Sequence, residues 1–76
     1  MRTVRLLGRA GCHLCDAARA QLEAVRRTHP FVLEEVDIET DDRLFKRYLE
    51  RIPVVELDGE ELFELFVDDE ILRRRL

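Results

Sequence analysis

Cys12 and Cys15 are the only cysteines in the 76-residue chain, and His13 and Leu14 separate them. A short apolar segment, 4–7, precedes the pair, and apolar residues at helical spacing follow it. A Cys-x-x-Cys pair that opens a helix after a strand is typical of a redox-active dithiol. The start of a helix stabilises a thiolate through its unpaired N–H groups and a charge of about +0.5. Because a thiolate attacks disulfides, the pair predicts disulfide chemistry.

The spacing predicts different roles for the two cysteines. We expect Cys12 at the N-cap or in the first turn, exposed, and Cys15 one turn deeper. In that geometry Cys12 attacks the disulfide, and Cys15 resolves the resulting mixed disulfide by displacing the substrate sulfur. There are two alternatives to a redox role. The pair could form half of a metal site, or both cysteines could be inert residues of the core. A zinc site usually needs four ligands, which only His13, His29 and carboxylates could complete, so no metal is predicted within one chain. A metal or cluster shared between two chains stays open.

The composition limits which binding partners and which cellular compartment we expect. The chain carries a net charge of −4, which disfavours nucleic acid as a partner. No apolar stretch approaches the roughly 20 residues of a membrane span, and no apolar leader precedes the first strand. We therefore expect a cytoplasmic monomer, a single domain over residues 1–76. Cytosolic thiols stay reduced, so a lone cysteine pair would not serve there as a stabilising disulfide.

The elements that position the dithiol follow from apolar spacing and from capping residues. The helix that begins at His13 ends before Pro30, because the residue before a proline resists the α conformation. The segment 31–38 predicts a second strand, at a sheet edge because glutamates interrupt it. The hydroxyl of Thr40 is expected to cap a second helix. Its expected buried residues are Leu44, Phe45, Tyr48 and Leu49.

The last third of the chain predicts a hairpin and a final helix. Segments 54–57 and 60–65 form the hairpin around Asp58-Gly59, a pair that suits a type I′ turn. The final helix begins at about Asp68, with acidic residues first and arginines last, as the helix dipole favours. The order β-α-β-α-β-β-α predicts an α/β fold with a four-stranded mixed sheet. Its first two strands should be parallel, joined by a right-handed crossover.

This layout resembles the thioredoxin fold in its minimal, glutaredoxin-sized form, and the Cys12–Cys15 motif is similar to that of small bacterial glutaredoxin-like proteins. A second marker is Ile52-Pro53, which opens the third strand. The resemblance implies a thiol–disulfide oxidoreductase that reduces protein disulfides or glutathione mixed disulfides, with no bound cofactor beyond its own cysteines. Its electron donor would be glutathione or, alternatively, thioredoxin reductase. A metal-carrying or partner-binding module of the same fold is the other alternative.

The resemblance also implies roles for residues around the dithiol. Pro53 would be cis and face the dithiol, and the backbone of Ile52 would bind an extended substrate. The two residues between the cysteines tune the redox potential in this fold, so His13 is expected to have a tuning role, since an imidazole can favour the thiolate or pass a proton. Arg9 lies where glutaredoxins commonly carry a lysine, and Arg51 where they usually carry a threonine. Either could hold a carboxylate of glutathione or of a partner.

The segment before the last helix departs from the glutaredoxin pattern. Asp68 and Asp69 align with the acidic pair that meets the amino group of glutathione in glutaredoxins, although N-capping explains Asp68 equally well. Leu65 and Phe66 replace the two glycines that normally precede that pair. Glycines allow close backbone approach and these side chains do not, so weak glutathione binding is predicted.

Overall fold

The computed structural model describes residues 1–76 and contains one mixed sheet. The strand order is β2-β1-β3-β4, with β1 and β2 parallel and the other neighbouring pairs antiparallel. This confirms the predicted fold class, including the parallel first pair and the second strand at a sheet edge. In chain order the elements are β1 (Thr3–Gly8), α1 (His13–Arg26), β2 (Val32–Asp37), the 3-10 helix η1 (Ile38–Thr40), α2 (Asp42–Tyr48), β3 (Val54–Leu57), β4 (Glu60–Glu64) and α3 (Asp69–Arg75).

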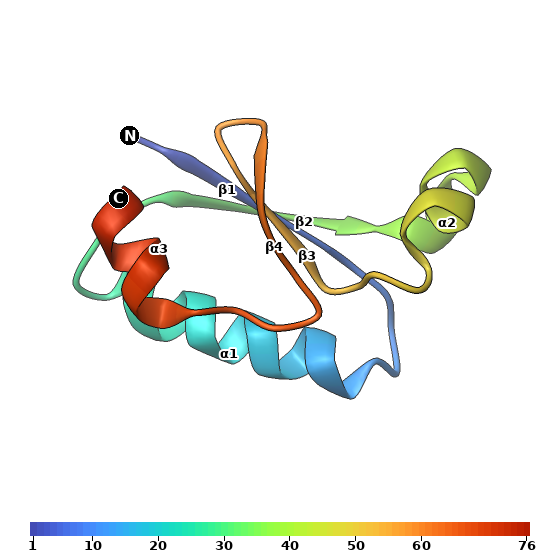
Figure 1. Cartoon of the computed structure of the whole chain (residues 1–76), viewed down its shortest axis with the longest axis horizontal. Coiled ribbons are helices and arrows are strands. Elements are labelled where there is room, and N and C mark those ends of the chain that lie inside the picture. Colours follow the sequence, from blue (N-terminus) through green and yellow to red (C-terminus); the bar gives the residue numbers. More distant parts are fainter.

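Two apolar clusters hold the helices to the sheet. Figure 1 shows α1 and α3 below the sheet and α2 at its right-hand end. The larger cluster joins β1 and β3 to α1 and α3, with Leu6, Leu22 and Leu72 among its buried members. The smaller cluster lies at the α2 end and contains Leu7, Cys15, Ile38, Tyr48, Ile52 and Val54. Because β1 points alternate side chains to opposite faces, Leu6 and Leu7 belong to different clusters.

Strand register brings three separate segments to one end of the sheet. Leu7 near the end of β1 pairs with Val54 at the start of β3, and Val54 pairs with Glu64 at the end of β4. The loop after β1, the segment before β3 and the segment after β4 therefore lie at the same end. That end carries the dithiol, the Ile52-Pro53 bond and Leu65-Phe66.

The second helix differs from its prediction. Asp41 caps it by accepting from the backbone N–H groups of Arg43 and Leu44, whereas the hydroxyl of Thr40 donates to the carbonyl of Asp37 in the preceding 3-10 turn. The expectation of a Thr40 cap was therefore wrong. The expected buried residues were also only partly correct. Tyr48 is buried, Leu44 and Phe45 are half-buried, and Leu49 is 37% exposed, because this short helix covers only one end of the sheet.

The hairpin and the last helix follow their predictions closely. Asp58 and Gly59 both have positive φ, 49° and 87°, as a type I′ turn requires. Asp68 caps α3 as expected. The strand β4 ends one residue early, at Glu64, because Leu65 adopts a φ of 69° that a strand cannot continue. None of the three α-helices combines the length and apolar character needed to cross a bilayer.

Candidate active site

Cys12 occupies the N-cap of α1. Its backbone is extended, and its Sγ accepts a hydrogen bond of 3.2 Å from the backbone N–H of Cys15. The residue before it, Gly11, has a φ of 77°, a conformation that glycine adopts without steric cost, and this turns the loop into the helix. The sulfur is half-buried and lies at the positive end of α1. Both the amide and the helix terminus stabilise negative charge on it.

Cys15 lies one turn deeper, and only 1% of it is exposed. A Cβ atom at Gly8 would lie 2.9 Å from its Sγ, so this position in β1 must lack a side chain for Cys15 to pack there. Burial and then the hydrogen bond with Cys12 raise the pKa of the Cys15 thiol to about 11, while the backbone amide of Arg9 acts in the opposite direction. Cys15 is therefore a protonated thiol near neutral pH. The predicted order of depth is confirmed, but Cys12 is half-buried at the N-cap and not exposed as expected.

The segment before β3 meets the dithiol through the smaller apolar cluster. Cys15 and Ile52 are both buried members of this cluster, and Cys12 packs against it. The Ile52-Pro53 bond is cis, which confirms that prediction, and Pro53 is buried. The substrate-binding role of the Ile52 backbone stays a prediction.

A cavity of about 520 Å³ lies between the start of α1 and β2, and Cys15 lines it together with Gly8, Arg9, Asp16, Arg19 and Asp37 among others. Arg19 joins the two sides of this cavity, because it pairs with Asp16 on its own helix and with Glu35 on β2. The cavity gives the inner thiol a polar neighbourhood on the side of β2. It belongs to the dithiol site.

The two arginines expected to bind carboxylates differ in how they are held. Arg51 pairs with Glu61 and with Glu64, at 2.6 Å to the latter, and its guanidinium lies 5.2 Å from the ring centre of Tyr48. Its charge is therefore already matched within the chain. Arg9 makes one long ion pair of 3.7 Å, with Glu39. Arg9 is thus the more available of the two for an incoming carboxylate.

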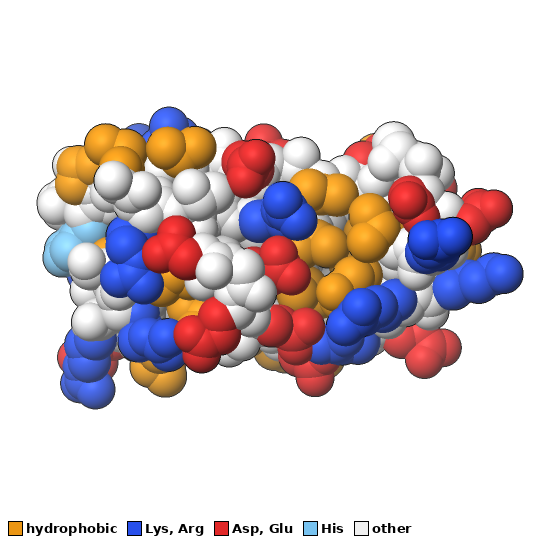
Figure 2. All heavy atoms as spheres, turned by 90° about the horizontal axis from the view of Figure 1, so that it is seen from above, with side chains coloured by type: hydrophobic (Ala, Val, Ile, Leu, Met, Phe, Trp, Pro, Cys, Tyr) orange, Lys and Arg blue, Asp and Glu red, His pale blue; other side chains and the backbone are white.

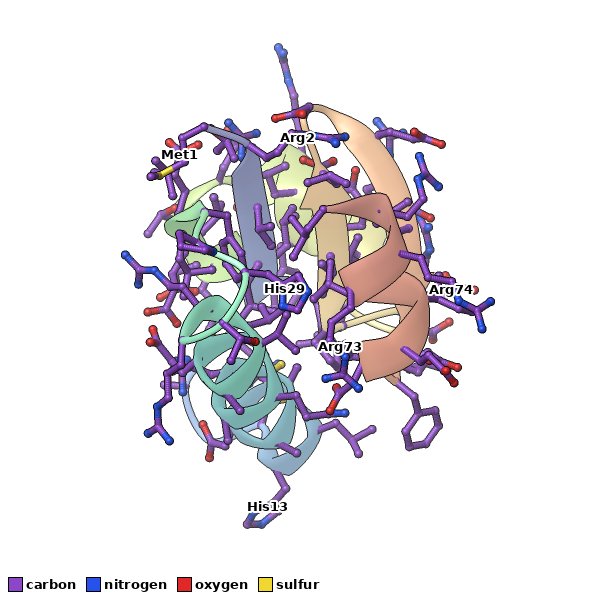
Figure 3. The ribbon with its side chains drawn as sticks, turned by 90° about the vertical axis from the view of Figure 1, so that its left-hand side faces the viewer. Met1, Arg2, His13, His29, Arg73 and Arg74 are labelled. Atoms are coloured by element: carbon purple, nitrogen blue, oxygen red, sulfur yellow. The ribbon has the colours of Figure 1, made fainter.

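His13 and Asp68 do not converge on the sulfurs. Figure 3 shows the side chain of His13 pointing away from the sheet at the start of α1, where it is exposed. Asp68 accepts hydrogen bonds from the amides of Glu70 and Ile71, at 3.0 and 3.1 Å, and so caps α3. The next residue, Asp69, accepts from Gln21. Gln21 is about 13 Å along the axis of α1 from Cys12, given the rise of an α-helix, so the acidic pair lies beside the middle of α1.

Leu65 has a backbone conformation that the sequence did not predict. Its φ is 69°, and the amide of Phe66 donates to the carbonyl of Glu64 at 2.8 Å, which together form a γ-turn of the rare, strained type. The amide of Leu65 donates to the carbonyl of Pro53 at 2.8 Å. Leu65 thus holds a conformation that suits glycine, and Phe66 beyond it is 71% exposed. The resemblance to glutaredoxins contained a signal for this conformation, because glutaredoxins normally have glycines at the positions of Leu65 and Phe66.

Two further contacts were missing from the sequence-based prediction. The proximity of Gly8 to Cys15 follows a recognisable signal, a glycine that ends a buried strand just before the motif. The pairing of Arg51 with Glu61 and Glu64 has no such signal, because it depends on how β4 lies beside the segment before β3. No three His, Cys, Asp or Glu side chains are grouped to hold a metal ion.

Comparisons with known proteins agree with this geometry. Residues 3–76 match the family model of the glutaredoxin-like domain (DUF836). The chain belongs to this family. A glutaredoxin-like fold and a Cys-x-x-Cys pair together indicate a redox function. A search of the curated proteins found no match.

Several solved structures are similar to this chain. A Nitrosomonas europaea protein studied by NMR is 31% identical, with a TM-score of 0.86 over 99% of this chain and 91% of its own. A protein of X. campestris is 33% identical, with a TM-score of 0.77 over 95% of this chain and 92% of its own. A thioredoxin from Halobacterium salinarum is 19% identical, with a TM-score of 0.68 over 97% of this chain and 70% of its own. This last similarity shows the thioredoxin fold alone.

Proposed function

We propose that this glutaredoxin-like protein is a thiol–disulfide oxidoreductase that reduces protein disulfides and mixed disulfides with small thiols. The observation that carries the proposal is the asymmetry within one helical turn. Cys12 is accessible at a helix N-cap, whereas Cys15 is buried behind it with a raised pKa. An accessible sulfur with a protected thiol one turn away suits a two-step exchange.

The exchange uses both sulfurs in sequence. The Cys12 thiolate attacks one sulfur of the substrate disulfide, forms a mixed disulfide and releases the other sulfur as a thiolate, which takes a proton from water. Cys15 then loses its proton to water and attacks the sulfur of Cys12, which displaces the second substrate sulfur as a thiolate that takes a proton from water. The products are two substrate thiols and a Cys12–Cys15 disulfide. Two electrons pass from the protein to the substrate, and a donor must return them.

Two donors are compatible with this chemistry, glutathione and a thioredoxin reductase. Arg9 remains available for a glutathione carboxylate. Against it, Leu65 and Phe66 place two side chains where glycines would let a tripeptide lie against the backbone. We therefore propose weak glutathione binding, with thioredoxin reductase as the alternative donor. The exposed Phe66 favours contact with a protein.

A reducing compartment would suit this activity. Cys12 and Cys15 are free thiols in the structure, and the cycle needs a supply of electrons to return them to that state. We propose that the protein works in the cytoplasm as a monomer, without a bound cofactor. This agrees with thiol chemistry in a compartment where glutathione and thioredoxin systems keep cysteines reduced.

A coupled turnover assay tests the proposed function. Bis(2-hydroxyethyl) disulfide serves as a small neutral substrate, and NADPH oxidation is followed with either glutathione plus glutathione reductase or thioredoxin reductase. We expect turnover with at least one donor and none with Cys12→Ser. Absence of turnover with both donors, for a folded protein whose thiols titrate as two, would reject the proposed activity. Higher turnover with thioredoxin reductase than with glutathione would identify the reductase as the donor.

A further inference from the structure

All three α-helices end in basic residues, but α2 is the one in which no basic side chain of the last turn forms an ion pair. The helix dipole favours basic side chains in the last turn of both α2 and α3. On α3, Arg74 pairs with Glu70 at 3.5 Å and Arg75 pairs with Glu60 at 2.7 Å. On α2, Lys46 and Arg47 are exposed and form no ion pair. The dipole explains why both helices are basic, but it leaves the charges of α2 available to a partner.

The unpaired cations line a hollow together with two apolar side chains, Phe45 and Leu49. This hollow has a volume of about 330 Å³ and is lined by Phe45, Lys46, Arg47, Leu49, Glu50 and Arg51. The charge of Arg51 is already matched by glutamates of β4. Lys46 and Arg47 therefore face a single acidic neighbour in the lining, Glu50. A lining with two apolar side chains and an excess of positive charge suits a short acidic segment that also has apolar groups.

The hollow lies next to the dithiol. Phe45, which forms part of its lining, packs against the apolar cluster that contains Cys15 and that Cys12 also contacts. From the loop before the motif, Arg9 places its guanidinium 5.9 Å from the ring centre of Phe45. Phe45 and Arg9 therefore connect the hollow to the loop that leads into the dithiol. Figure 2 shows an apolar area toward the α2 end with both basic and acidic side chains at its edges.

We propose that the α2 hollow docks an acidic segment of the disulfide-bearing protein substrate, adjacent to the cysteine that Cys12 attacks; this proposal rests on the proposed oxidoreductase activity. The chain as a whole carries a net charge of −4 and repels an acidic partner. Local cations beside the dithiol would reverse that repulsion at one place and so orient the encounter with the sulfurs facing each other. Electrostatic complementarity of this kind acts mainly on association rate and specificity.

The occupant is a polypeptide segment rather than glutathione. Glutathione offers carboxylates to Lys46 and Arg47, but it has no apolar side chain to cover Phe45 and the partly exposed Leu49. A protein segment with carboxylates and a neighbouring apolar residue meets both parts of the hollow. It also agrees with the exposed Phe66, which follows β4 at the same end of the sheet.

The test compares two disulfide peptides of identical length, one flanked by glutamates and one by lysines, with bis(2-hydroxyethyl) disulfide as a neutral reference. The test variant is the double substitution Lys46→Glu and Arg47→Glu. The control is the double substitution Arg27→Glu and Arg73→Glu, which reverses two exposed, unpaired cations at the ends of α1 and α3. These lie at the end of the molecule opposite α2 (Figure 1). Each peptide rate is divided by the rate that the same variant shows with the neutral disulfide.

For the wild type we expect a kcat/KM at least about tenfold higher for the acidic peptide than for the basic one at low salt, and a smaller ratio at 0.5 M salt. The test variant should lose this preference or reverse it. The control should keep it within about twofold. The neutral double variant Lys46→Gln and Arg47→Gln should show an intermediate preference, which separates charge from any loss of folding.

Three results would contradict the docking proposal. One is an equal rate for the two peptides with the wild type, and a second is an equal loss of preference in test and control variants. The third is a dependence of glutathione turnover, but not of peptide reduction, on Lys46 and Arg47. If no disulfide is reduced at all, the oxidoreductase proposal fails instead. In that case calorimetry tests the docking proposal separately, with the acidic peptide in which serine replaces each cysteine. If the wild type and the control bind this peptide and the test variant does not, the docking proposal is supported.

Discussion

The two cysteines of this protein lie within one turn of the same helix, yet their surroundings differ in almost every respect. Cys12 caps α1, is half-buried, and accepts an amide hydrogen bond. Cys15 is only 1% exposed, packs against apolar side chains, and has a pKa raised to about 11. The same residue type therefore has two different surroundings, a partly exposed sulfur at the helix start and a buried, protonated thiol one turn deeper. Position within the turn, rather than residue type, assigns the roles.

The largest expected effect comes from removing one sulfur at a time. Cys12→Ser should abolish disulfide reduction, because no other thiol is accessible. Cys15→Ser should still form a mixed disulfide through Cys12 but should not release it, and mass spectrometry should find the adduct on the intact protein. Full activity in both single variants would contradict the division of roles.

A second prediction concerns the depth of the inner sulfur. Gly8→Ala would bring a Cβ atom to 2.9 Å from the Sγ of Cys15, so Cys15 or β1 must shift. Overpacking of this kind typically costs about 1–3 kcal/mol, measurable as a loss in the free energy of unfolding in urea. The control is a double-mutant cycle with Cys15→Ala. The same Gly8→Ala change should cost less in that background, and an equal cost would place the strain elsewhere.

The raised pKa of Cys15 predicts a specific pH dependence of stability. The folded state holds this thiol neutral up to about pH 11, whereas an unfolded cysteine ionises with a pKa near 9.0. Below the unfolded pKa the stabilisation is fully present, and it is lost as the pH rises toward the folded value. Reduced wild type should therefore lose about 2 kcal/mol more than Cys15→Ala between pH 8 and 10.5, measured by urea unfolding. Equal losses would show that burial does not suppress ionisation at this site.

A several-fold effect is expected for the surroundings of the outer sulfur. Replacing Leu65 and Phe66 by glycine should strengthen glutathione binding, because the γ-turn conformation is retained without side chains in the way. One or two recovered backbone hydrogen bonds, at about 0.5–1.5 kcal/mol each, correspond to a several-fold lower dissociation constant. Calorimetry on the Cys12→Ser background avoids thiol exchange. Tight glutathione binding by the unaltered segment would contradict the predicted exclusion.

The smallest effect is expected at His13. Its side chain points away from the sheet and is exposed, so water and salt screen its effect on the dithiol. His13→Gln should change the reduction potential by less than about 30 mV, measured by equilibration with a glutathione redox buffer. A larger shift would make His13 a main determinant of the difference between the two thiols.

Most of the framework follows from local signals in the sequence. The order of elements, the type I′ turn at Asp58-Gly59 and the Asp68 cap each depend on a few neighbouring residues. The depth of Cys15 relative to Cys12 follows from helical spacing alone. These features were predictable because local geometry decides them before tertiary packing does.

The remaining features depend on contacts between distant segments. Arg51 was expected to be available to a substrate, but Glu61 and Glu64 of β4 match its charge. Leu65 keeps a positive φ because its amide is held by the carbonyl of Pro53, a contact across the sheet end. Asp41 caps α2 in place of Thr40, because the hydroxyl of Thr40 donates to the carbonyl of Asp37 in the 3-10 turn. Spacing and propensity do not contain such information.

The most direct test of the difference between Cys12 and Cys15 is limited alkylation of the reduced wild type. A substoichiometric amount of iodoacetamide at pH 7, followed by peptide mapping, reports which sulfur is both accessible and ionised. We predict modification at Cys12, with Cys15 labelled only after unfolding in urea. Equal labelling of the folded protein, or faster labelling of Cys15, would contradict it.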